Sequence, residues 1–444
     1  MTDNAFPAST RAWFWRVFSL AWPIILSGLS VPLVGLVDTA VMGQLPEPRF
    51  MAAVAVGAVV FSSVFWIFGF LRMGTTGFVA QASGRSDNAE IALALLRALL
   101  VAVLLGMLVI LLQYPLGELS LWLMGAEAQV TESARDYFYL RVWSAPATFI
   151  NYVVLGGLIG LQRMRAALMV QLLLNLSNML LDAGFVLWLG MEVQGVALAS
   201  LLSEFLAAGL GLWLLRDCLV LSEPFGVADK TLRQQIFNAE ALKRLISVNA
   251  DLFLRTLLLT AGFFFFTAQG AQFGTVVLAA NAILMNMFSL MAYGLDGFAH
   301  AAEALVGGAY GAGNRKAFRQ AVRSSTIMAF VLAAVVSLLY LLFGGLIIQM
   351  ITDIDAVIVM ANQYLIWMVI LPLVGVWSFQ LDGIFVGTMQ TLYMRNTVAA
   401  ALLIYVVLAY FTVPVWGNHA LWACMVLFMA LRGLFLGLLY PRIQ

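Results

Sequence analysis

Long apolar stretches recur along the whole chain, and they constrain its fold more than any other feature of the sequence. The first, Leu20–Gly43, is long enough to cross the hydrocarbon core of a bilayer as a helix, which takes about 20 residues. Because that core holds no water, a crossing segment must be a helix or part of a closed barrel. Barrel strands would read as alternating segments of about ten residues, a pattern absent here. With 63% hydrophobic and 10% charged residues, the chain is predicted to be an all-α polytopic membrane protein.

Twelve apolar runs are predicted to cross the membrane. They cover residues 14–42, 50–73, 89–115, 133–161, 166–190, 194–216, 244–270, 275–304, 317–347, 356–388, 394–414 and 419–440. The only sizeable hydrophilic connector follows the sixth run. The predicted organisation is therefore an N-terminal lobe of six helices over residues 1–216, a connecting loop over 217–243, and a C-terminal lobe of six helices over 244–444.

Lysine and arginine residues gather in the loops that follow the second, fourth, sixth, eighth and tenth runs. Loops rich in these residues stay in the cytoplasm. Both termini and the 217–243 loop are therefore predicted to be cytoplasmic, in a multi-pass protein of the inner membrane. The first run lacks a small-residue cleavage site after it, which favours an uncleaved first helix.

The two halves of the chain resemble each other. Tyr139 and Tyr364, Pro146 and Pro372, and Gly160 and Gly387 are separated by 225, 226 and 227 residues. The segment VAQASGRSDNAEI, which begins at residue 79, likewise lies 227 residues before VGGAYGAGNRKAF. Three matches at nearly one offset indicate a duplication. Because each repeat has six spans, the lobes should be pseudo-symmetric about an axis along the membrane normal, with a central cleft.

Several motifs, taken in their order and spacing, resemble those of the MATE (multidrug and toxic compound extrusion) transporters. They are PIILSGLSVPLVGLVDTAVMG in the first span, GTTGFVAQASG from residue 74, EALVGGAYGAGNRKAF from residue 303 and GNHALW from residue 417. FLRMGTTG, AYGLDGFAHAAEA and LIWMVILPLVGVWSFQLDGIFVG resemble the DinF-type branch. The resemblance covers nearly the whole chain. It implies twelve helices in two lobes, and efflux of amphipathic compounds coupled to protons or sodium.

An acidic pair is predicted in the first lobe. Asp38 lies six residues, about 9 Å, from Gln44 at the outer end of its span, and Asp182 lies eight residues, about 12 Å, from Gly190. The two acids could therefore meet at similar depth, with Asn178 one helical turn from Asp182. Two nearby carboxylates cannot both ionise cheaply, so one is expected to hold a proton. A buried membrane acid is by default a functional candidate, although hydrogen bonding between the two helices would also explain the pair.

The resemblance assigns the family's ion site to Asp38, Asn178 and Asp182, with Ser200 where many members carry threonine. Some members have an additional amide four residues before the first acid, where this chain has Val34. A sodium shell would lose an oxygen ligand there. The sequence therefore favours protons over sodium as the coupling ion.

Four other residues of the first lobe stand out from the apolar background. Pro23 and Pro32 each remove a backbone hydrogen bond from the first helix and are predicted to act as bend points. Asn151 is a candidate cavity residue. Glu204 is expected to reach toward a neighbouring side chain.

The second lobe does not repeat this acidic pattern, because the position 227 residues after the first acid is Phe265. Asp251 and Arg255 are four apart on one predicted helix and are expected to form an intrahelical ion pair. Asp296 and Asp382 are candidate cavity acids. Together these four are the second-lobe candidates for a site.

The sequence predicts an antiporter that exports amphipathic, cationic compounds in exchange for protons by alternating access. The alternatives are a sodium-coupled multidrug exporter and a lipid-precursor flippase of the same superfamily. An intramembrane enzyme is disfavoured because no nucleophile–base or metal cluster is recognisable, and a channel fits a six-helix duplication less well. No cofactor, metal site or nucleic-acid partner is expected. The expected partners are small amphipathic substrates and membrane lipids, and the chain is expected to be a monomer.

Overall fold

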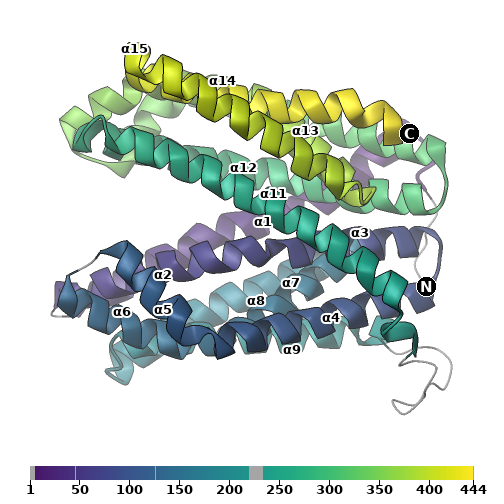
Figure 1. The fold of residues 1–444 in the computed structure, drawn as a ribbon, viewed down its shortest axis with the longest axis horizontal. Coiled ribbons are helices and arrows are strands. Elements are labelled where there is room, and N and C mark those ends of the chain that lie inside the picture. The colour runs from purple at the N-terminus through teal and green to yellow at the C-terminus, as the bar shows by residue number, and fades with distance from the viewer. Residues whose placement is uncertain (1–5, 46, 126, 220–233, 444) are drawn as a thin grey trace. The chain divides into compact units, whose positions relative to one another are not determined.

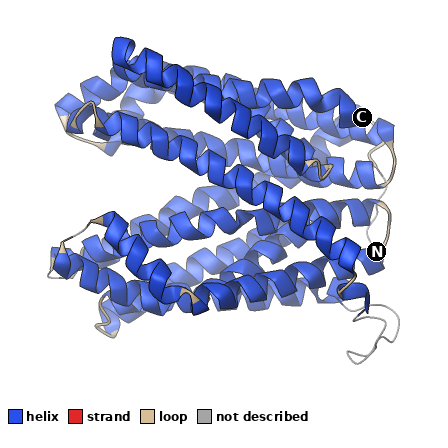
Figure 2. Cartoon of the chain, in the orientation of Figure 1, coloured by secondary structure: helices blue, strands red, loops and turns tan. Residues whose placement is uncertain are grey.

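The computed structural model describes residues 6–45, 47–125, 127–219 and 234–443. Within these ranges the secondary structure is helical and no strand is found (Figure 2). Eleven helical segments of the described chain are long and apolar enough to cross a membrane. The last of them, Thr391–Ile443, breaks at Gly417 and accounts for two predicted spans. The prediction of an all-α polytopic membrane protein is confirmed.

The helices of the first half of the chain are α1 (Thr10–Met42), α2 (Pro48–Trp66), η1 (Ile67–Gly69), α3 (Phe70–Gly84), α4 (Asn88–Leu111), α5 (Gln113–Met124), α6 (Ala128–Arg141), η2 (Val142–Ser144), α7 (Ala145–Gly160), α8 (Met164–Ala183), the π-helical turn η3 (Gly184–Trp188) and α9 (Val193–Leu219) (Figure 1). Those of the second half are α11 (Ala239–Ala271), α12 (Thr275–Gly311), α13 (Arg315–Ile351), α14 (Asp355–Gly387), α15 (Thr391–Leu439) and η4 (Tyr440–Ile443). The second predicted span is α2, η1 and α3 together, and the fourth is α6, η2 and α7. The sequence does not predict α5, because its 12 residues are too few to cross a bilayer.

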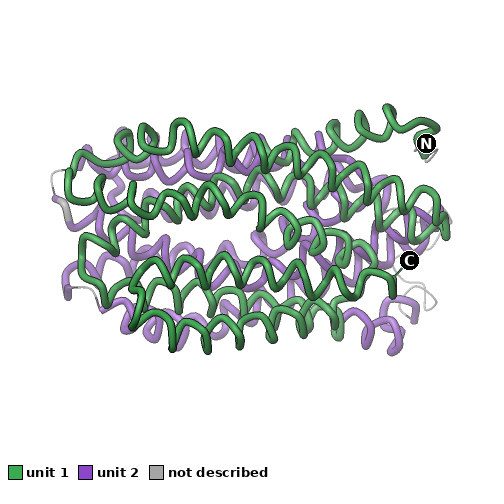
Figure 3. The backbone as a smooth tube through the Cα atoms, turned by 90° about the horizontal axis from the view of Figure 1, so that it is seen from above, with its two compact units in different colours: residues 1–25, 246–444 green, residues 26–245 purple. Residues whose placement is uncertain are grey.

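The chain divides into two compact units (Figure 3). The N-unit is residues 26–245, and the C-unit is residues 1–25 with 246–444. The boundary falls inside α1, so the first half of that helix belongs to the C-unit. There its Ile25 lies against Gly297 of α12, where a methyl group would come within 2.3 Å of the Ile25 side chain. Residues 220–233 of the predicted connecting loop lie outside the described residues, and the predicted lobe limits of 1–216 and 244–444 stay a prediction.

Glycines at equivalent positions of the two units bring helices into close contact. A methyl group on Gly156 of α7 would lie 2.4 Å from the carbonyl oxygen of Arg72 on α3. One on Gly383 of α14 would lie 2.4 Å from the carbonyl oxygen of Ala299 on α12. One turn later the contact repeats: a methyl group on Gly160 would meet the carbonyl oxygen of Thr76, and one on Gly387 would meet the carbonyl oxygen of Glu303. Every one of these residues lies 227 positions from its counterpart, so the same helix contact occurs in both repeats.

The break in α15 is built around Gly417, whose φ of 59° and ψ of −141° are unfavourable for any residue with a side chain. The next residue, Asn418, exchanges two amide hydrogen bonds with Asn281 of α12, at 2.8 and 2.9 Å. The indole of Trp422 also donates to the Asn281 side-chain oxygen, at 2.9 Å. All three side chains are buried. This network joins the break in α15 to α12 within the C-unit.

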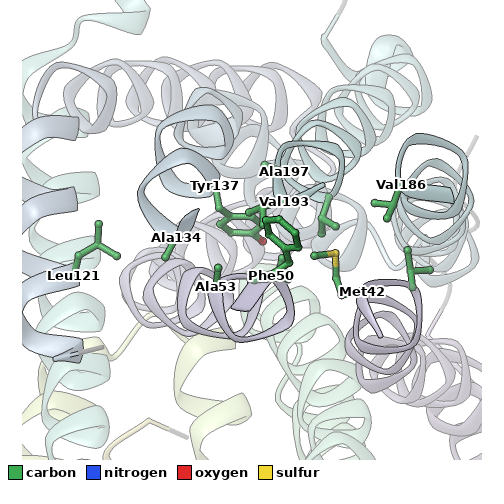
Figure 4. Close-up of a cluster of buried hydrophobic side chains, with 12 residues drawn as sticks. Met42, Phe50, Ala53, Leu121, Ala134, Tyr137, Val186, Val193 and Ala197 are labelled. Carbon is green, nitrogen blue, oxygen red and sulfur yellow. The ribbon is translucent and has the colours of Figure 1, made fainter. Parts of the chain in front are cut away.

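A cluster of buried apolar side chains closes one end of the N-unit (Figure 4). Met42 at the end of α1, Phe50 of α2, Tyr137 of α6 and Val186 of η3 all belong to it. The Tyr137 ring is fully buried. The cluster therefore fixes the end of α1 beside α6 and the turn that follows α8.

Candidate functional site

Helices α1 and α8 are neighbours in the N-unit and run in the same direction. The side-chain amide of Asn175 on α8 donates to the Ser30 hydroxyl of α1 at 2.6 Å. Asp38 follows Ser30 by eight residues, about 12 Å, and Asp182 follows Asn175 by seven, about 10.5 Å. Two parallel neighbouring helices therefore carry their acids to the same level. The acids lie between this polar contact and the apolar cluster that contains Met42.

The carboxyl groups of Asp38 and Asp182 lie within hydrogen-bonding reach of each other. Asp182 is fully buried, and neither of its oxygens receives a hydrogen bond from a donor in the described chain. The same is true of Oδ1 of Asp38. Because ionised carboxylates only accept hydrogen bonds, the two groups can bond to each other only when one of them carries a proton. The structure thus brings together the two acids that the sequence places at similar depth, and their coupling role remains a prediction.

The other two residues of the predicted N-lobe site lie on α8 and α9. The Asn178 amide donates to the Ser200 hydroxyl at 3.2 Å, and both side chains are buried. In the described chain, the Asn178 side chain thus has Ser200 as its hydrogen-bond partner. The contact joins α8 to α9 one helical turn from Asp182. The π-helical turn η3 begins two residues after Asp182, and such turns are frequent at functional sites.

An arginine that the sequence analysis missed lies among the N-unit acids. Arg141 ends α6, donates to the Tyr137 hydroxyl and has its guanidinium 4.7 Å from the centre of the Phe61 ring. It interacts electrostatically with both Asp38 and Asp182. Arg141 lies within the predicted fourth span, and a cation inside a span costs as much to bury as an acid. A search for basic as well as acidic residues within spans would have found it.

Asn151 contacts Glu204 rather than the acidic pair. Its amide donates to the Glu204 carboxylate at 2.7 Å and to the Glu204 backbone oxygen at 2.9 Å, which joins α7 to α9. Glu204 also interacts electrostatically with Arg141. The expectation that Glu204 reaches toward a neighbouring side chain agrees with this contact. The two residues extend the polar group of the N-unit from α1 and α8 to α7 and α9.

The predicted bend points lie in a helix that continues without interruption. Pro23 and Pro32 are both inside α1, which runs from Thr10 to Met42. The boundary between the two units falls between Ile25 and Leu26, two residues after Pro23. Their role as hinges remains a prediction.

The expected ion pair between Asp251 and Arg255 is wrong. The Asp251 carboxylate instead accepts from Arg395 at 2.7 Å and from Thr391 at 3.2 Å, both near the start of α15. Arg255 donates to Asp382 of α14. Four-residue spacing puts two side chains on one helix face, but here each side chain has its partner on another helix.

Asp382 is not a free cavity acid. Its Oδ2 accepts from Arg255 and from Arg432 of α15, the latter at 2.6 Å, and all three side chains are buried. Asp296 of α12 interacts electrostatically with Arg432. Two acids and two arginines in this region have a formal charge of zero. The two candidate cavity acids, Asp296 and Asp382, therefore lie in a charge-balanced region, and Arg432 is the residue that the sequence analysis did not anticipate there.

No group of three or more His, Cys, Asp or Glu residues that could hold a metal ion occurs in the described part of the chain. What the fold contains instead is a duplicated helical unit, long apolar spans and a pair of carboxyl groups inside a membrane helix bundle. Duplicated bundles with buried ionisable residues are typical of secondary transporters.

Comparison with known proteins also indicates a transporter. Residues 23–183 and 252–411 match the protein-family model MatE. The chain is 41% identical to the DNA damage-inducible protein F of Escherichia coli (strain K12), over 99% of this chain and 94% of that protein. It is 24% identical to the probable multidrug resistance protein NorM of Bacillus subtilis (strain 168), over 86% and 84% of the two chains. The chain belongs to the MatE family of multidrug and toxic compound extrusion transporters.

Solved structures show the same fold. The Vibrio cholerae MATE transporter VcmN superposes with a TM-score of 0.85 at 19% identity, over 98% of both chains. A MOP superfamily transporter from Pyrococcus furiosus superposes with a TM-score of 0.83 at 20% identity, over 98% of this chain and 96% of that one. The family match and the 41% identity to DNA damage-inducible protein F confirm the resemblance to MATE transporters of the DinF-type branch, and with it a multi-pass membrane protein of the transporter class.

Proposed function

We propose that this transporter exports amphipathic, cationic compounds across the inner membrane in exchange for protons. It acts by alternating access, as a monomer with both termini in the cytoplasm. The observation that carries the proposal is the carboxyl pair of Asp38 and Asp182, in which both oxygens of Asp182 and Oδ1 of Asp38 receive no hydrogen bond from other donors of the described chain.

The pair supports exchange because its hydrogen bond needs a proton. With a proton between the carboxyl groups, the pair carries one negative charge and holds α1 beside α8. Without it, two carboxylates face each other at close range in a medium of low dielectric constant, and repulsion drives them apart. A substrate cation offsets the second negative charge. A proton that arrives from outside restores the pair and weakens the binding of that cation, so that the two bind in alternation.

Helix α1 is the element through which this exchange would act. The bundle changes shape only if a helix has two arrangements that proton binding biases. Pro23 and Pro32 leave backbone carbonyl groups of α1 without their usual partners, which lowers the cost of bending. The unit boundary within α1, two residues after Pro23, supports a bend there.

The preference for cations is supported by the N-unit alone. Its polar group has three acids, Asp38, Asp182 and Glu204, and one arginine, Arg141. The four charged residues around Asp382 in the C-unit have a formal charge of zero. Cells that overexpress the protein should therefore resist lipophilic cationic dyes more than anionic amphiphiles of equal size. Equal protection against bile salts would overturn the charge preference and leave the transporter class untouched.

Proton release tests the coupling. Purified protein in weakly buffered solution should release protons when a cationic dye is added, and Asp38→Asn should abolish both this release and pH-driven export from proteoliposomes. Asp182→Asn should change the pH dependence of export. Glu118→Gln is the matched control, since it removes one acid outside the spans. Normal proton release and export by Asp38→Asn would refute the proposal. Export driven by a sodium gradient without a pH gradient would assign sodium instead.

The orientation is tested by labelling. A chain that lacks Cys218 and Cys424 and carries Lys243→Cys should resist a membrane-impermeant thiol reagent added to intact spheroplasts. The same site should react once the membrane is opened. Labelling in intact spheroplasts would place the connecting loop, and with it the termini, on the periplasmic side.

A further inference from the structure

A cavity of about 260 Å³ lies where three helical elements of the C-unit end. Tyr310 near the end of α12, Asn314 before α13, Phe318 on α13 and Arg442 in η4 line it. Arg315 and Arg319 of α13 complete its wall. The candidate membrane spans Thr275–Gly311 and Arg315–Ile351 end and begin here, so we expect the cavity to lie on the surface side of the membrane.

The charge of this arginine cavity is one-sided. Its three arginines, Arg315, Arg319 and Arg442, are exposed, and no acidic residue lines it. None of the three forms an ion pair with a carboxylate in the described chain. Apolar contact is also available, since the buried Phe318 ring lies beside Tyr310 and Tyr440. Three guanidinium groups around an apolar base leave a positive hollow without a counter-charge from the described residues.

The equivalent loop of the other repeat provides a contrast within the same molecule. There a cavity of about 250 Å³ contains the buried Arg97. Arg97 pairs with Glu90 at 3.2 Å and donates to the carbonyl oxygens of Gln235 and Ile236. At the offset of 227 the acid Glu90 corresponds to Ala317. The N-unit cavity is also lined by Arg85, Arg244 and Glu240, so acids lie beside its arginines, whereas no acid lines the arginine cavity of the C-unit.

We propose that the arginine cavity binds the phosphate group of an anionic phospholipid at the membrane surface. Arginine presents donors in a planar fork that matches phosphate oxygens, and basic pockets at helix ends are sites for anionic headgroups. A volume near 260 Å³ lies below the roughly 300–1,000 Å³ of sites for drug-sized ligands, which favours a headgroup over an exported compound. The exposed Tyr310 is of the type that settles at the bilayer interface. This site is independent of the coupling ion and of the exported substrate.

Lipid titration of the full-length protein tests the site. Wild type in detergent is titrated with dihexanoyl phosphatidylglycerol or, for comparison, the zwitterionic phosphatidylcholine, and binding is followed by native mass spectrometry. One phosphatidylglycerol should bind more tightly than phosphatidylcholine. The triple variant Arg315→Gln, Arg319→Gln, Arg442→Gln should bind it about 100-fold more weakly, at about fivefold for each surface cation.

The control is a second triple variant that loses three exposed cations of the N-unit, with the substitutions Arg165→Gln, Arg216→Gln and Lys243→Gln. It should lose less than fivefold, and circular dichroism should show that both variants are folded. Equal weakening in the two variants, or no preference for phosphatidylglycerol in wild type, would overturn the proposal, because diffuse surface charge would then explain the binding. Displacement by millimolar inorganic phosphate would identify the phosphate group itself as sufficient, and resistance to it would assign the site to the lipid.

Discussion

Replacing Gly383 by alanine should destabilise the C-unit by forcing α14 away from α12. The added methyl carbon would lie 2.4 Å from the Ala299 carbonyl oxygen, 3.0 Å from its carbon and 3.1 Å from Cα. Carbon contacts are optimal at about 3.5–4.0 Å, so the helices must separate by about 1 Å. All three atoms are backbone, and none can rotate aside.

The magnitude follows from two opposing effects. Overpacking of this kind costs about 1–3 kcal/mol, and the better helix propensity of alanine offsets at most about 1 kcal/mol. Because the overlap at Gly383 is with backbone, we expect a net loss of about 1–2 kcal/mol in the free energy of unfolding. The same loss is expected for Gly156→Ala in the N-unit, which meets the Arg72 carbonyl oxygen at the same distance.

The measurement is unfolding of the purified protein in mixed micelles by titration with sodium dodecyl sulfate, followed by far-ultraviolet circular dichroism. The matched control is Gly209→Ala on α9, where an added methyl group meets no atom within 4 Å. That variant should be as stable as wild type or more so. If Gly383→Ala is no less stable than Gly209→Ala, the close helix contact does not limit the size of this residue, and the reasoning fails.

The same unfolding assay checks three further expectations. Asp382→Asn leaves buried arginines without their carboxylate and should lower the free energy of unfolding by about 3–5 kcal/mol. Adding Arg432→Met should restore part of this loss, whereas strict additivity of the two changes would contradict the pairing. Arg135 donates to both oxygens of Glu118 at 2.8 Å and holds the pKa of Glu118 below its ordinary value of 4.5. A lowered pKa stabilises the fold fully above that ordinary value, and the effect is lost as pH falls through the lowered one. The difference between wild type and Glu118→Gln should therefore begin to shrink below pH 4.5 and vanish once pH is below the lowered pKa, and a difference that persists in strong acid would show another origin. Gly417→Ala should cost about 1–3 kcal/mol because its backbone conformation strains any other residue, and a neutral outcome would show that α15 can close the break.

The spans and the duplication could be predicted from sequence because both depend on local pattern. A run of about 20 apolar residues must cross the membrane wherever it lies, and the repeated offset of 227 reappears as the matched contacts of Gly156 and Gly383. The distance of Asp38 and Asp182 from their helix ends predicts their common level for the same reason.

Partners across helices could not be predicted in this way. Helical spacing shows that Asp251 and Arg255 share a face, but it says nothing of their partners on other helices. Arg395 of α15 pairs with Asp251, and Asp382 of α14 pairs with Arg255. The choice between a partner on the same helix and one on another depends on how helices are arranged side by side. Arg141 was missed for a different reason, because a span was searched for acids alone.

The duplicated backbone with diverged polar groups indicates which unit can respond to protons. In the N-unit the nearest group to Asp182 is another carboxyl, so adding or removing a proton changes whether α1 and α8 attract or repel each other. In the C-unit the nearest groups to Asp382 are two guanidinium ions, and protonating that acid would strand both of them in a buried site. The first arrangement favours a change of state, and the second opposes one. The partners of the acids, rather than their number, therefore support the proposed coupling site in the N-unit. The test compares Asp38→Asn with Asp382→Asn: the first should remain folded without coupling, and the second should lose stability before it loses coupling.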